Sequence, residues 1–231
     1  MRRGVVVTGG SRGIGLATAR LFQGLGHEVV SLSRSAPPTP EIEHLAADIT
    51  DLASVERAAA LVAERAAIWD RTVLIHNAAV HRHDTVPDLS ARDLLAVLSA
   101  NLAAPQALNQ RLVPVMKPGS SILYVGSTLA EKAVAGAASY VASKHGMIGL
   151  MRATCQDLAG SGVHTACVCP GFTDTEMLRA HVGEAIEAIT GMVAAGRLLN
   201  PEEIADLIRV CADSPALNGA VLHANLGQIE R

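Results

Sequence analysis

The chain is poor in aromatic residues and has little net charge of either sign. Its 231 residues include two Phe, two Tyr and one Trp, and 19 Lys and Arg stand against 22 Asp and Glu. This near balance predicts neither a nucleic-acid partner nor binding to an anionic membrane surface. An apolar content of 49% excludes a chain that is disordered throughout. The length suits one domain that buries its core without disulfides or a structural metal.

Long apolar runs and targeting signals are also lacking. No uncharged apolar stretch reaches the roughly 20 residues of a membrane-spanning helix. After Met1 the chain passes directly into a short apolar strand and a glycine loop, without a hydrophobic region of signal-peptide length. We therefore expect a cytoplasmic protein.

Cysteine is scarce, and the four residues stand at positions 155, 167, 169 and 211. Only Cys167 and Cys169 are close in sequence, and no second pair has the spacing of a zinc site. Buried free thiols are the simplest interpretation. The run His81-Arg82-His83-Asp84 is the other metal candidate, but its two histidines have no evident third ligand and favour a polar loop. We expect no bound metal.

Apolar strands alternate with helices along the whole chain. Strands are predicted at residues 4–8, 29–32, 44–47, 73–76, 121–125, 163–168 and 220–223. Helices are predicted at residues 16–22, 51–67, 90 to about 115, 140–158 and from 201 onward. This alternation predicts an α/β domain, in which a parallel sheet of about seven strands is covered by helices on both faces.

One connection departs from the alternation. Residues 34–42 contain Pro37, Pro38 and Pro40, which exclude a helix between the second and third strands. An extended chain of this length reaches roughly 30 Å, which is enough to recross a strand. We expect an irregular crossover that leaves one face of the sheet thinly covered.

A glycine cluster lies between the first predicted strand and the first predicted helix. Glycines let the backbone approach a pyrophosphate, and the N-terminus of the helix supplies unpaired N–H groups. The position after an N-terminal strand, more than the glycines themselves, favours dinucleotide binding. The loop consists of Thr8, Gly9, Gly10, Ser11, Arg12, Gly13, Ile14 and Gly15.

The end of the second strand indicates which dinucleotide binds. It reads Ser33-Arg34 and has no carboxylate for a ribose 2′-hydroxyl. Arg34 and Arg12 both carry the planar guanidinium that suits a 2′-phosphate, so we predict NADP(H) in preference to NAD(H). The alternative is that both arginines are solvated surface charges.

Tyr140 and Lys144 lie four residues apart on one predicted helix, and hence on one face of it. A phenol acts as an acid near neutral pH only if its ordinary pKa of about 10 falls by about 3 units. One fixed cation at about 4–5 Å contributes ~3–4 kcal/mol at an effective dielectric near 20, which is the size required. The pair is therefore a candidate for proton transfer.

Taken together and in this order, the motifs resemble those of the short-chain dehydrogenase/reductase family, in its single-domain branch. The resemblance covers essentially the whole chain and includes further positions. These are Asp48 with Ile49, Asn77 with Ala78, Asn101, Ser127, and Pro170-Gly171 with Thr173. The resemblance implies a Rossmann-like, doubly wound parallel sheet in a single domain that spans residues 1–231.

The resemblance also implies a role for each site residue. Tyr140 gives its proton to a carbonyl oxygen as hydride arrives from the nicotinamide, and Ser127 hydrogen-bonds that oxygen. Lys144 makes the phenol a stronger acid and binds the nicotinamide ribose, while Asn101 anchors a water that relays protons to Lys144. The implied cofactor-binding residues are Thr8, Gly9, Ser11, Arg12, Gly13, Ile14, Gly15, Ser33, Arg34, Asp48, Ile49, Asn77, Ala78, Tyr140, Lys144, Pro170, Gly171 and Thr173.

Each of these residues has a structural alternative when it is considered alone. Ser127 is then a turn residue, Asn101 a residue at a helix kink and Tyr140 a core aromatic. Three departures from the family pattern are also visible, and the first is His76, which replaces an asparagine. Ala79 replaces a glycine, which matters only where the backbone needs positive φ, and the ending Ala224-Asn225-Leu226-Gly227 differs from the usual family ending.

Three segments are expected to face the substrate: residues 80–84, 128–138 and 172–196, the last as a lid. Apart from Phe172 they contain no aromatic residue and are rich in Ala, Val, Leu and Met, which favours a small or aliphatic ketone. The chain is similar to 3-oxoacyl-[acyl-carrier-protein] reductases among members of the family. Lys132, Arg152 and Arg179 offer only a sparse basic rim for an acidic carrier protein.

The predicted function is hydride transfer between NADP(H) and a carbonyl or secondary alcohol. One alternative is a catalytically idle dinucleotide-binding regulator or scaffold, and another is an NAD-dependent alcohol dehydrogenase. An isomerase or lyase of the extended branch would need a larger C-terminal region than the residues after about 200 supply. The resemblance implies a homodimer or homotetramer, formed through the helices that begin near residues 90 and 140.

Overall fold

The computed structural model describes residues 1–228, in which seven parallel strands form one sheet. The strand order is β3-β2-β1-β4-β5-β6-β7, so the direction of winding reverses between β1 and β4. This is the predicted α/β class, a single Rossmann-like domain. The strands are β1 (Arg3–Thr8), β2 (Glu28–Ser33), β3 (Glu43–Ala46), β4 (Arg71–His76), β5 (Ser121–Val125), β6 (His164–Pro170) and β7 (Ala220–Ala224).

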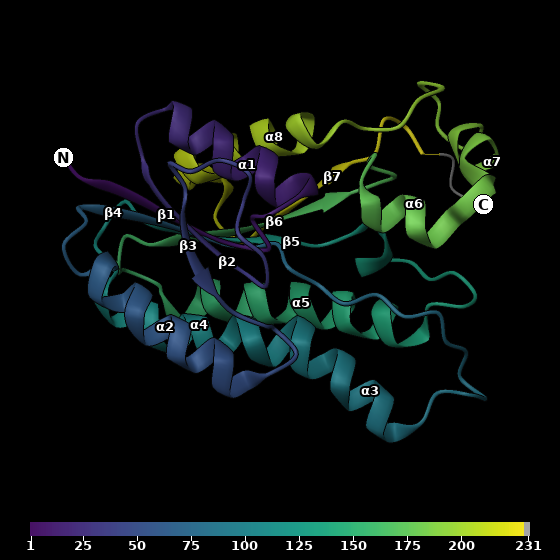
Figure 1. The fold of residues 1–231 in the computed structure, drawn as a ribbon, viewed down its shortest axis with the longest axis horizontal. Coiled ribbons are helices and arrows are strands. Elements are labelled where there is room, and N and C mark those ends of the chain that lie inside the picture. The colour runs from purple at the N-terminus through teal and green to yellow at the C-terminus, as the bar shows by residue number, and fades with distance from the viewer. Residues whose placement is uncertain (229–231) are drawn as a thin grey trace.

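Helices cover the sheet on both faces (Figure 1). On one face lie α1 (Gly13–Gly24) and α8 (Pro201–Asp213), and on the other lie α2 (Leu52–Ala66), α4 (Ala104–Leu112) and α5 (Ala138–Asp157). The helix α3 (Ala91–Leu98) projects beyond the second layer. The short helices α6 (Glu176–Val182) and α7 (Ile186–Thr190) stand at the end of the molecule that β6 points to.

The helices begin where the sequence supplies caps. The side chains of Asp51 and Ser90 accept hydrogen bonds from the backbone N–H groups of Ala53 and Asp93, at the starts of α2 and α3. At the start of α8, the carboxylate of Glu203 accepts a 2.9 Å bond from the N–H of Asn200. These side chains satisfy N–H groups that have no partner inside the helix.

The core consists of two apolar clusters, one on each face of the sheet. Trp69, Tyr124 and Met151 belong to the cluster under α2, α4 and α5, and Phe22 and Ile208 belong to the cluster under α1 and α8. Both clusters draw on strands that are buried along almost their whole length, as expected for a parallel sheet covered twice.

The crossover between β2 and β3 contains no helix, as the three prolines predict. Pro37 and Ile42 are buried and anchor the segment against the rest of the molecule. The side chains of His44 and Leu45 in the short edge strand β3 are only partly buried. The thin cover predicted for this part of the sheet is therefore present.

The prediction of one helix from residue 90 to about 115 was too simple. The segment is helical throughout, but α3 and α4 are separated by a π-helical turn at Ser99–Ala103, and a 3₁₀ turn at Val113–Val115 ends it. The prediction missed Pro105, which has no N–H to give to the carbonyl of Asn101 four residues earlier. The α-helical bond at that carbonyl cannot form.

The remaining sequence predictions concern cysteines and membranes. All four cysteines are free thiols, and the sulfur atoms of Cys167 and Cys169 lie 3.8 Å apart in the buried part of β6. Among residues 1–228, no helix has both the length and the apolar character needed to cross a membrane.

Candidate active site

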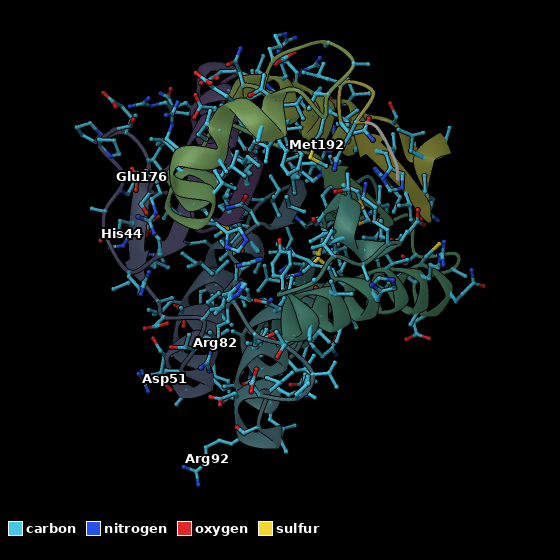
Figure 2. All side chains as sticks on the ribbon, turned by 90° about the vertical axis from the view of Figure 1, so that its right-hand side faces the viewer. His44, Asp51, Arg82, Arg92, Glu176 and Met192 are labelled. Carbon is cyan, nitrogen blue, oxygen red and sulfur yellow. The ribbon has the colours of Figure 1, made fainter. Side chains whose placement is uncertain are left out.

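A cleft of about 880 Å³ opens at the carboxyl ends of the strands, where the strand order reverses. The glycine loop between β1 and α1 forms one side of this cleft, and the segments after β4, β5 and β6 form the rest. Figure 2 looks onto this end of the molecule, where the labelled residues Glu176, Met192 and Arg82 lie. The volume lies in the upper part of the usual range for ligand sites.

The glycine loop leaves no room for side chains at its critical positions. Gly13 has φ +54°, a conformation that other residues rarely adopt. A Cβ at Gly15 would lie 2.2 Å from the carbonyl oxygen of Gly9 and 2.5 Å from the side-chain nitrogen of Asn77. The loop therefore needs glycine at both positions. Because Gly9, Gly13 and Ile14 line the cleft at the N-terminus of α1, these residues fit a dinucleotide pyrophosphate.

The end of β4 braces the glycine loop. The hydroxyl oxygen of Thr8 accepts hydrogen bonds from the N–H groups of Asn77 (2.9 Å) and Ala78 (3.0 Å), and the Asn77 amide donates to the carbonyl of Thr8 (2.9 Å). Ala79 has no positive φ, so its replacement of the family's glycine has no cost in backbone conformation.

Ser33, Arg34 and Asp48 line the cleft at its far end, beyond β2 and β3. The carboxylate of Asp48 accepts bonds from the backbone N–H (2.9 Å) and the hydroxyl (2.8 Å) of Thr50. These bonds, helped by the positive charge of Arg34, lower the pKa of Asp48 below its usual value. Arg34 is exposed beside the cleft, and the end of β2 carries no carboxylate.

Arg12 lies in the cleft but is paired with another residue of the protein. Its guanidinium Nη1 lies 2.7 Å from a carboxylate oxygen of Glu176, in the first turn of α6. The sequence prediction placed Arg12 beside Arg34 at a phosphate and did not foresee this ion pair. Both side chains are largely exposed, at 60% and 70%, so the pair is weak and exchangeable.

Tyr140 and Lys144 lie in the first turns of α5 and both line the cleft. Lys144 is only 2% exposed, and its ammonium group donates a 2.8 Å bond to the carbonyl of Val125 at the end of β5. The Lys144 nitrogen lies 5.5 Å from the centre of the Tyr140 ring. The structure thus brings a buried cation next to a phenol that faces the cleft.

Ser127 and Asn101 lie on the elements next to α5. The hydroxyl oxygen of Ser127 accepts a 3.1 Å bond from the N–H of Leu129, which begins the short 3₁₀ turn Thr128–Ala130. Asn101 is buried in the π-helical turn, and its amide group bonds the N–H and the carbonyl of Val80 (2.8 and 2.9 Å) and the hydroxyl of Ser143 (2.9 Å). Asn101 therefore joins the π-helical turn to the loop after β4 and to α5.

Pro170 ends β6, and it closes the cleft at the side of β7 together with Gly171 and Thr173, which follow the strand. The N–H of Gly171 donates to the carbonyl of Ala224 (2.8 Å), and the hydroxyl of the buried Thr173 donates to the carbonyl of Gly171 (3.1 Å). A side chain at Gly171 would meet Asn225, so the chain needs glycine here.

The outer part of the cleft has an apolar wall with a few polar groups. The polar groups include His81, Lys132, Glu176, His181 and Gln228. The N–H of Ala194 donates to the carbonyl of Gly227 (3.0 Å), so the predicted lid is tied to the C-terminal segment. The apolar residues are Leu129, Val134, Phe172, Met177, Leu178, Val182 and Met192.

Glu176, His181 and Gln228 are site residues that the sequence did not indicate. Glu176 and His181 stand five residues apart on α6, within the predicted lid, and no motif distinguishes them from its other polar residues. Gln228 lies beyond the last strand, and its side-chain oxygen is buried without a partner among the described residues. Only their place in the fold brings these residues to the cleft.

No metal site accompanies the cleft in the described part of the chain. Among the described side chains, which are those of residues 1–228 without Glu184, no three of His, Cys, Asp or Glu gather closely enough to bind an ion. The two histidines of the loop after β4 lie instead against other rings. His81 contacts Tyr140 and His181, and His83 lies 6.4 Å from His181.

The fold and the cleft define a dinucleotide-binding oxidoreductase of the α/β class. A family profile described as Enoyl-(Acyl carrier protein) reductase matches residues 9–228. The chain belongs to the short-chain dehydrogenase/reductase family. It is an enzyme of this family and acts on a CH–OH or C=O group.

Individual relatives support the same assignment along the whole chain. The chain is 30% identical to the 3-oxoacyl-[acyl-carrier-protein] reductase MabA of Mycobacterium tuberculosis over 229 residues, which are 97% of this chain and 92% of the relative. The ligand-free aldohexose dehydrogenase of Thermoplasma acidophilum superposes with a TM-score of 0.90 at 25% identity, covering 98% and 94% of the two chains. A short-chain dehydrogenase of Burkholderia cenocepacia in complex with NADP superposes with a TM-score of 0.88 at 28% identity, covering 97% and 96%.

Proposed function

We propose that this enzyme reduces the carbonyl group of a small or aliphatic ketone with NADPH, and that a 3-oxoacyl thioester is its substrate class. The observation that best supports this proposal is the meeting of the glycine loop, Arg34 and the Tyr140/Lys144 pair in one cleft. A binding protein without catalysis would have no need of a buried lysine beside a phenol that faces the ligand.

The bound nicotinamide supplies the hydride, and the residues of the chain supply the proton and the binding geometry. Tyr140 donates the proton of its phenol to the carbonyl oxygen. The Ser127 oxygen already accepts a bond from Leu129, and its hydroxyl hydrogen can be donated to the same carbonyl oxygen. Lys144 stabilises the phenolate that remains, and its bond to Val125 leaves further N–H donors for a ribose hydroxyl.

Asn101 supplies the next step in the proton path. Its side chain bonds Val80 and Ser143, so we assign the water that serves Lys144 to its backbone carbonyl. Pro105 cannot donate the α-helical bond to that carbonyl. The π-helical turn lies where this α-helical bond is missing, which favours a water at this oxygen.

NADP(H) is the preferred cofactor on the grounds of charge. Arg34 lines the cleft, and the end of β2 has no carboxylate. The carboxylate of Asp48 is already hydrogen-bonded to the backbone N–H and the hydroxyl of Thr50. A carboxylate in this place would bind a ribose 2′-hydroxyl and repel a 2′-phosphate, whereas a guanidinium binds the phosphate. The relative from Burkholderia cenocepacia, solved with NADP, supports this choice.

The substrate class follows from the wall of the cleft and from the relatives. Its outer part combines aliphatic and methionine side chains with one aromatic residue, Phe172, which suits an acyl chain. The activity of MabA as a 3-oxoacyl-[acyl-carrier-protein] reductase supports the thioester. Arg179 forms two bonds with the carboxylate of Asp174, at 2.6 and 2.8 Å, and so adds little to a basic rim. We therefore favour a free thioester over a carrier-bound one.

The proposal is tested by NADPH oxidation with a panel of ketones and 3-oxoacyl thioesters, free and carrier-bound. We expect turnover of aliphatic 3-oxoacyl thioesters, and a loss of at least ~10²-fold in kcat for Tyr140→Phe. Tyr124→Phe is the matched control, because it removes the other phenol of the chain from a buried position outside the cleft. Absence of turnover across the panel, with NADPH bound normally, would leave a dinucleotide-binding regulator as the function.

The assembly is also a proposal. Leu95 on α3 is 66% exposed, and α3 packs beside α5, so a second copy can cover this apolar side chain. We infer a homo-oligomer formed through α3 and α5, as a dimer or tetramer. Light scattering of the wild type should give a molecular mass that is a multiple of 24.0 kDa, the mass of one chain. Leu95→Glu should lower the measured mass. A monomeric wild type would contradict the inference.

A further inference from the structure

The loop after β4 is fixed at both of its ends. At Val80, the amide of Asn101 bonds both the N–H (2.8 Å) and the carbonyl (2.9 Å) of the backbone. At Asp84, the carboxylate accepts bonds from the N–H (2.9 Å) and the hydroxyl of Ser139, in the first turn of α5. The backbone of Asp84 also pairs with Gly136 and Ala138. Residues between Val80 and Asp84 therefore have a fixed place beside the start of α5.

His81 lies between these two anchors and contacts Tyr140. The centres of the two rings are 4.4 Å apart, and the planes are inclined by 57°. Contacts of this kind favour particular orientations of the two rings. Tyr140 directly follows the anchored Ser139, so both the backbone and the ring of Tyr140 are held by the same loop.

The ring of His81 also contacts the lid. His181 of α6 meets it edge to face, with ring centres 4.1 Å apart and an angle of 73°. His181 lies on the helix that carries Glu176, the partner of Arg12. The chain of contacts thus runs from the lid through His181 and His81 to the phenol ring of Tyr140.

His81 carries no charge at neutral pH. Partial burial and the neighbouring His181 lower its pKa to about 4, and His83 and Lys144 act in the same direction, against the opposing effect of Asp84. Arg82, on the same loop, is engaged with Asp93. A neutral ring can pack on Tyr140 without adding a second positive charge beside Lys144.

We propose that His81 is a positioning residue for Tyr140 and that, through His181, it makes the orientation of Tyr140 depend on how α6 is seated over the cleft. This inference rests on the proposed function, in which Tyr140 donates the proton. At its start, α6 also contacts Arg12 of the glycine loop through Glu176, and at its end it contacts His81 through His181. Tyr140 is oriented when α6 is seated over the cleft, and it is not oriented when α6 is displaced.

Steady-state kinetics of ring-removing variants tests the first part of the proposal. His81→Ala should lower kcat about 2- to 10-fold, the effect of losing one aromatic contact, and leave KM for NADPH unchanged. His81→Phe keeps a ring of similar size and should restore most of the kcat. His145→Ala is the control, because His145 is exposed on the same helix as Tyr140 and outside the cleft.

The dependence on α6 is tested by a double-mutant cycle. His181→Ala should lower kcat to a similar extent as His81→Ala, and the double variant should lose little more than either single variant. Additive losses would overturn the link to the lid. Unchanged kcat in His81→Ala would overturn the positioning role itself, provided that Tyr140→Phe inactivates the enzyme.

A measurement without turnover separates this inference from the proposed function. The chain has two tyrosines, and Tyr124 is buried in the core, so ring-labelled tyrosine gives two assignable nuclear magnetic resonance signals. His81→Ala and His181→Ala should both move the Tyr140 signal and leave the Tyr124 signal in place. If His181→Ala leaves the Tyr140 signal unmoved, α6 does not act on the phenol. A protein that turns over no substrate but gives these shifts would contradict the proposed function alone.

Discussion

Arg12 of the glycine loop and Glu176 of α6 form an ion pair of 2.7 Å across the mouth of the cleft. Residues 164 positions apart in the sequence thus connect the predicted phosphate-binding loop to the predicted lid. Because both side chains are exposed, the pair is worth at most ~1 kcal/mol and is easily exchanged for another partner. Under the proposed function, a cofactor phosphate would be such a partner for Arg12.

Replacing Glu176 by glutamine should strengthen the binding of NADPH. The variant removes the carboxylate that competes for Arg12, and a gain of about 2- to 5-fold in affinity corresponds to the loss of one exposed ion pair. The gain should shrink as salt is added. Calorimetric titration with NADPH at low and high ionic strength measures both effects. Weaker binding in Glu176→Gln would mean that the ion pair supports the cofactor site instead of competing with it.

Arg34→Asp should change the choice of cofactor. It replaces a guanidinium by a carboxylate, which repels a 2′-phosphate and accepts a bond from a 2′-hydroxyl. KM for NADPH should rise by about 10- to 100-fold, the range of a lost charge-assisted hydrogen bond, with little rise for NADH. Arg92→Asp makes the same change of charge on α3 and is the control (Figure 2). Equal effects on both cofactors would refute the role of Arg34.

Gly15→Ala should abolish cofactor binding, while Gly149→Ala should not. The new Cβ at Gly15 would overlap the carbonyl of Gly9, whereas a Cβ at Gly149 in α5 would meet no atom within 4 Å. Alanine at an exposed helical glycine stabilises a helix by up to ~1 kcal/mol. Cofactor titration and thermal unfolding of the two variants check this pair of outcomes. Normal NADPH affinity in Gly15→Ala would show that the loop relaxes around the added methyl group.

His76 should make the fold sensitive to acid. Its ring is 1% exposed, and its Nε2 lies 2.8 Å from the side-chain oxygen of Asn109. Burial lowers the pKa of His76 to about 4, although the bond to Asn109 opposes this. The unfolded chain, with a pKa near 6.5, then binds more protons than the folded one between pH 6.5 and 4, so the free energy of unfolding falls as the pH falls through this range.

At pH 4, protonation linked to His76 should lower the free energy of unfolding by at most about 3 kcal/mol. Above pH 6.5, His76 should cause no such loss of stability. Urea unfolding at several pH values measures it. The pKa of His81 is lowered as well, so His81 should also destabilise the fold as the pH falls. The unfolding of His81→Phe is therefore measured in the same way to separate the two histidines. His76→Asn removes the titrating ring and should flatten the acid limb, even where it lowers the stability at pH 7. An acid limb of equal slope in wild type and His76→Asn would assign the effect to other groups.

Much of the fold was predictable because its signals are local. Each strand is an apolar run, and the glycine loop, the caps at Asp51 and Ser90 and the prolines of residues 34–42 act on neighbours in the chain. The π-helical turn was missed because the pattern of apolar residues continues through it. Its one local sign is Pro105, four residues after Asn101.

The site was predictable only in part. Tyr140, Lys144, Ser127 and Asn101 stand in motifs whose spacing is recognisable. The fold brings the first three into the cleft with the glycine loop, whereas Asn101 is buried behind it against Val80 and Ser143. The partners of Arg12 and Tyr140 were not predictable in this way. Glu176 and His181 reach the cleft only because α6 folds back over the ends of the strands.

The sequence by itself determined the α/β class, the glycine loop between the first strand and the first helix, and the family, because strand and helix periodicity and turn chemistry depend on residues a few positions apart. The scarcity of aromatic residues also distinguishes Tyr140, which is one of only two tyrosines in the chain. Tertiary structure alone decided which charges meet and which rings touch. Those contacts join residues up to 164 positions apart, and their geometry depends on the packing of whole helices against the sheet.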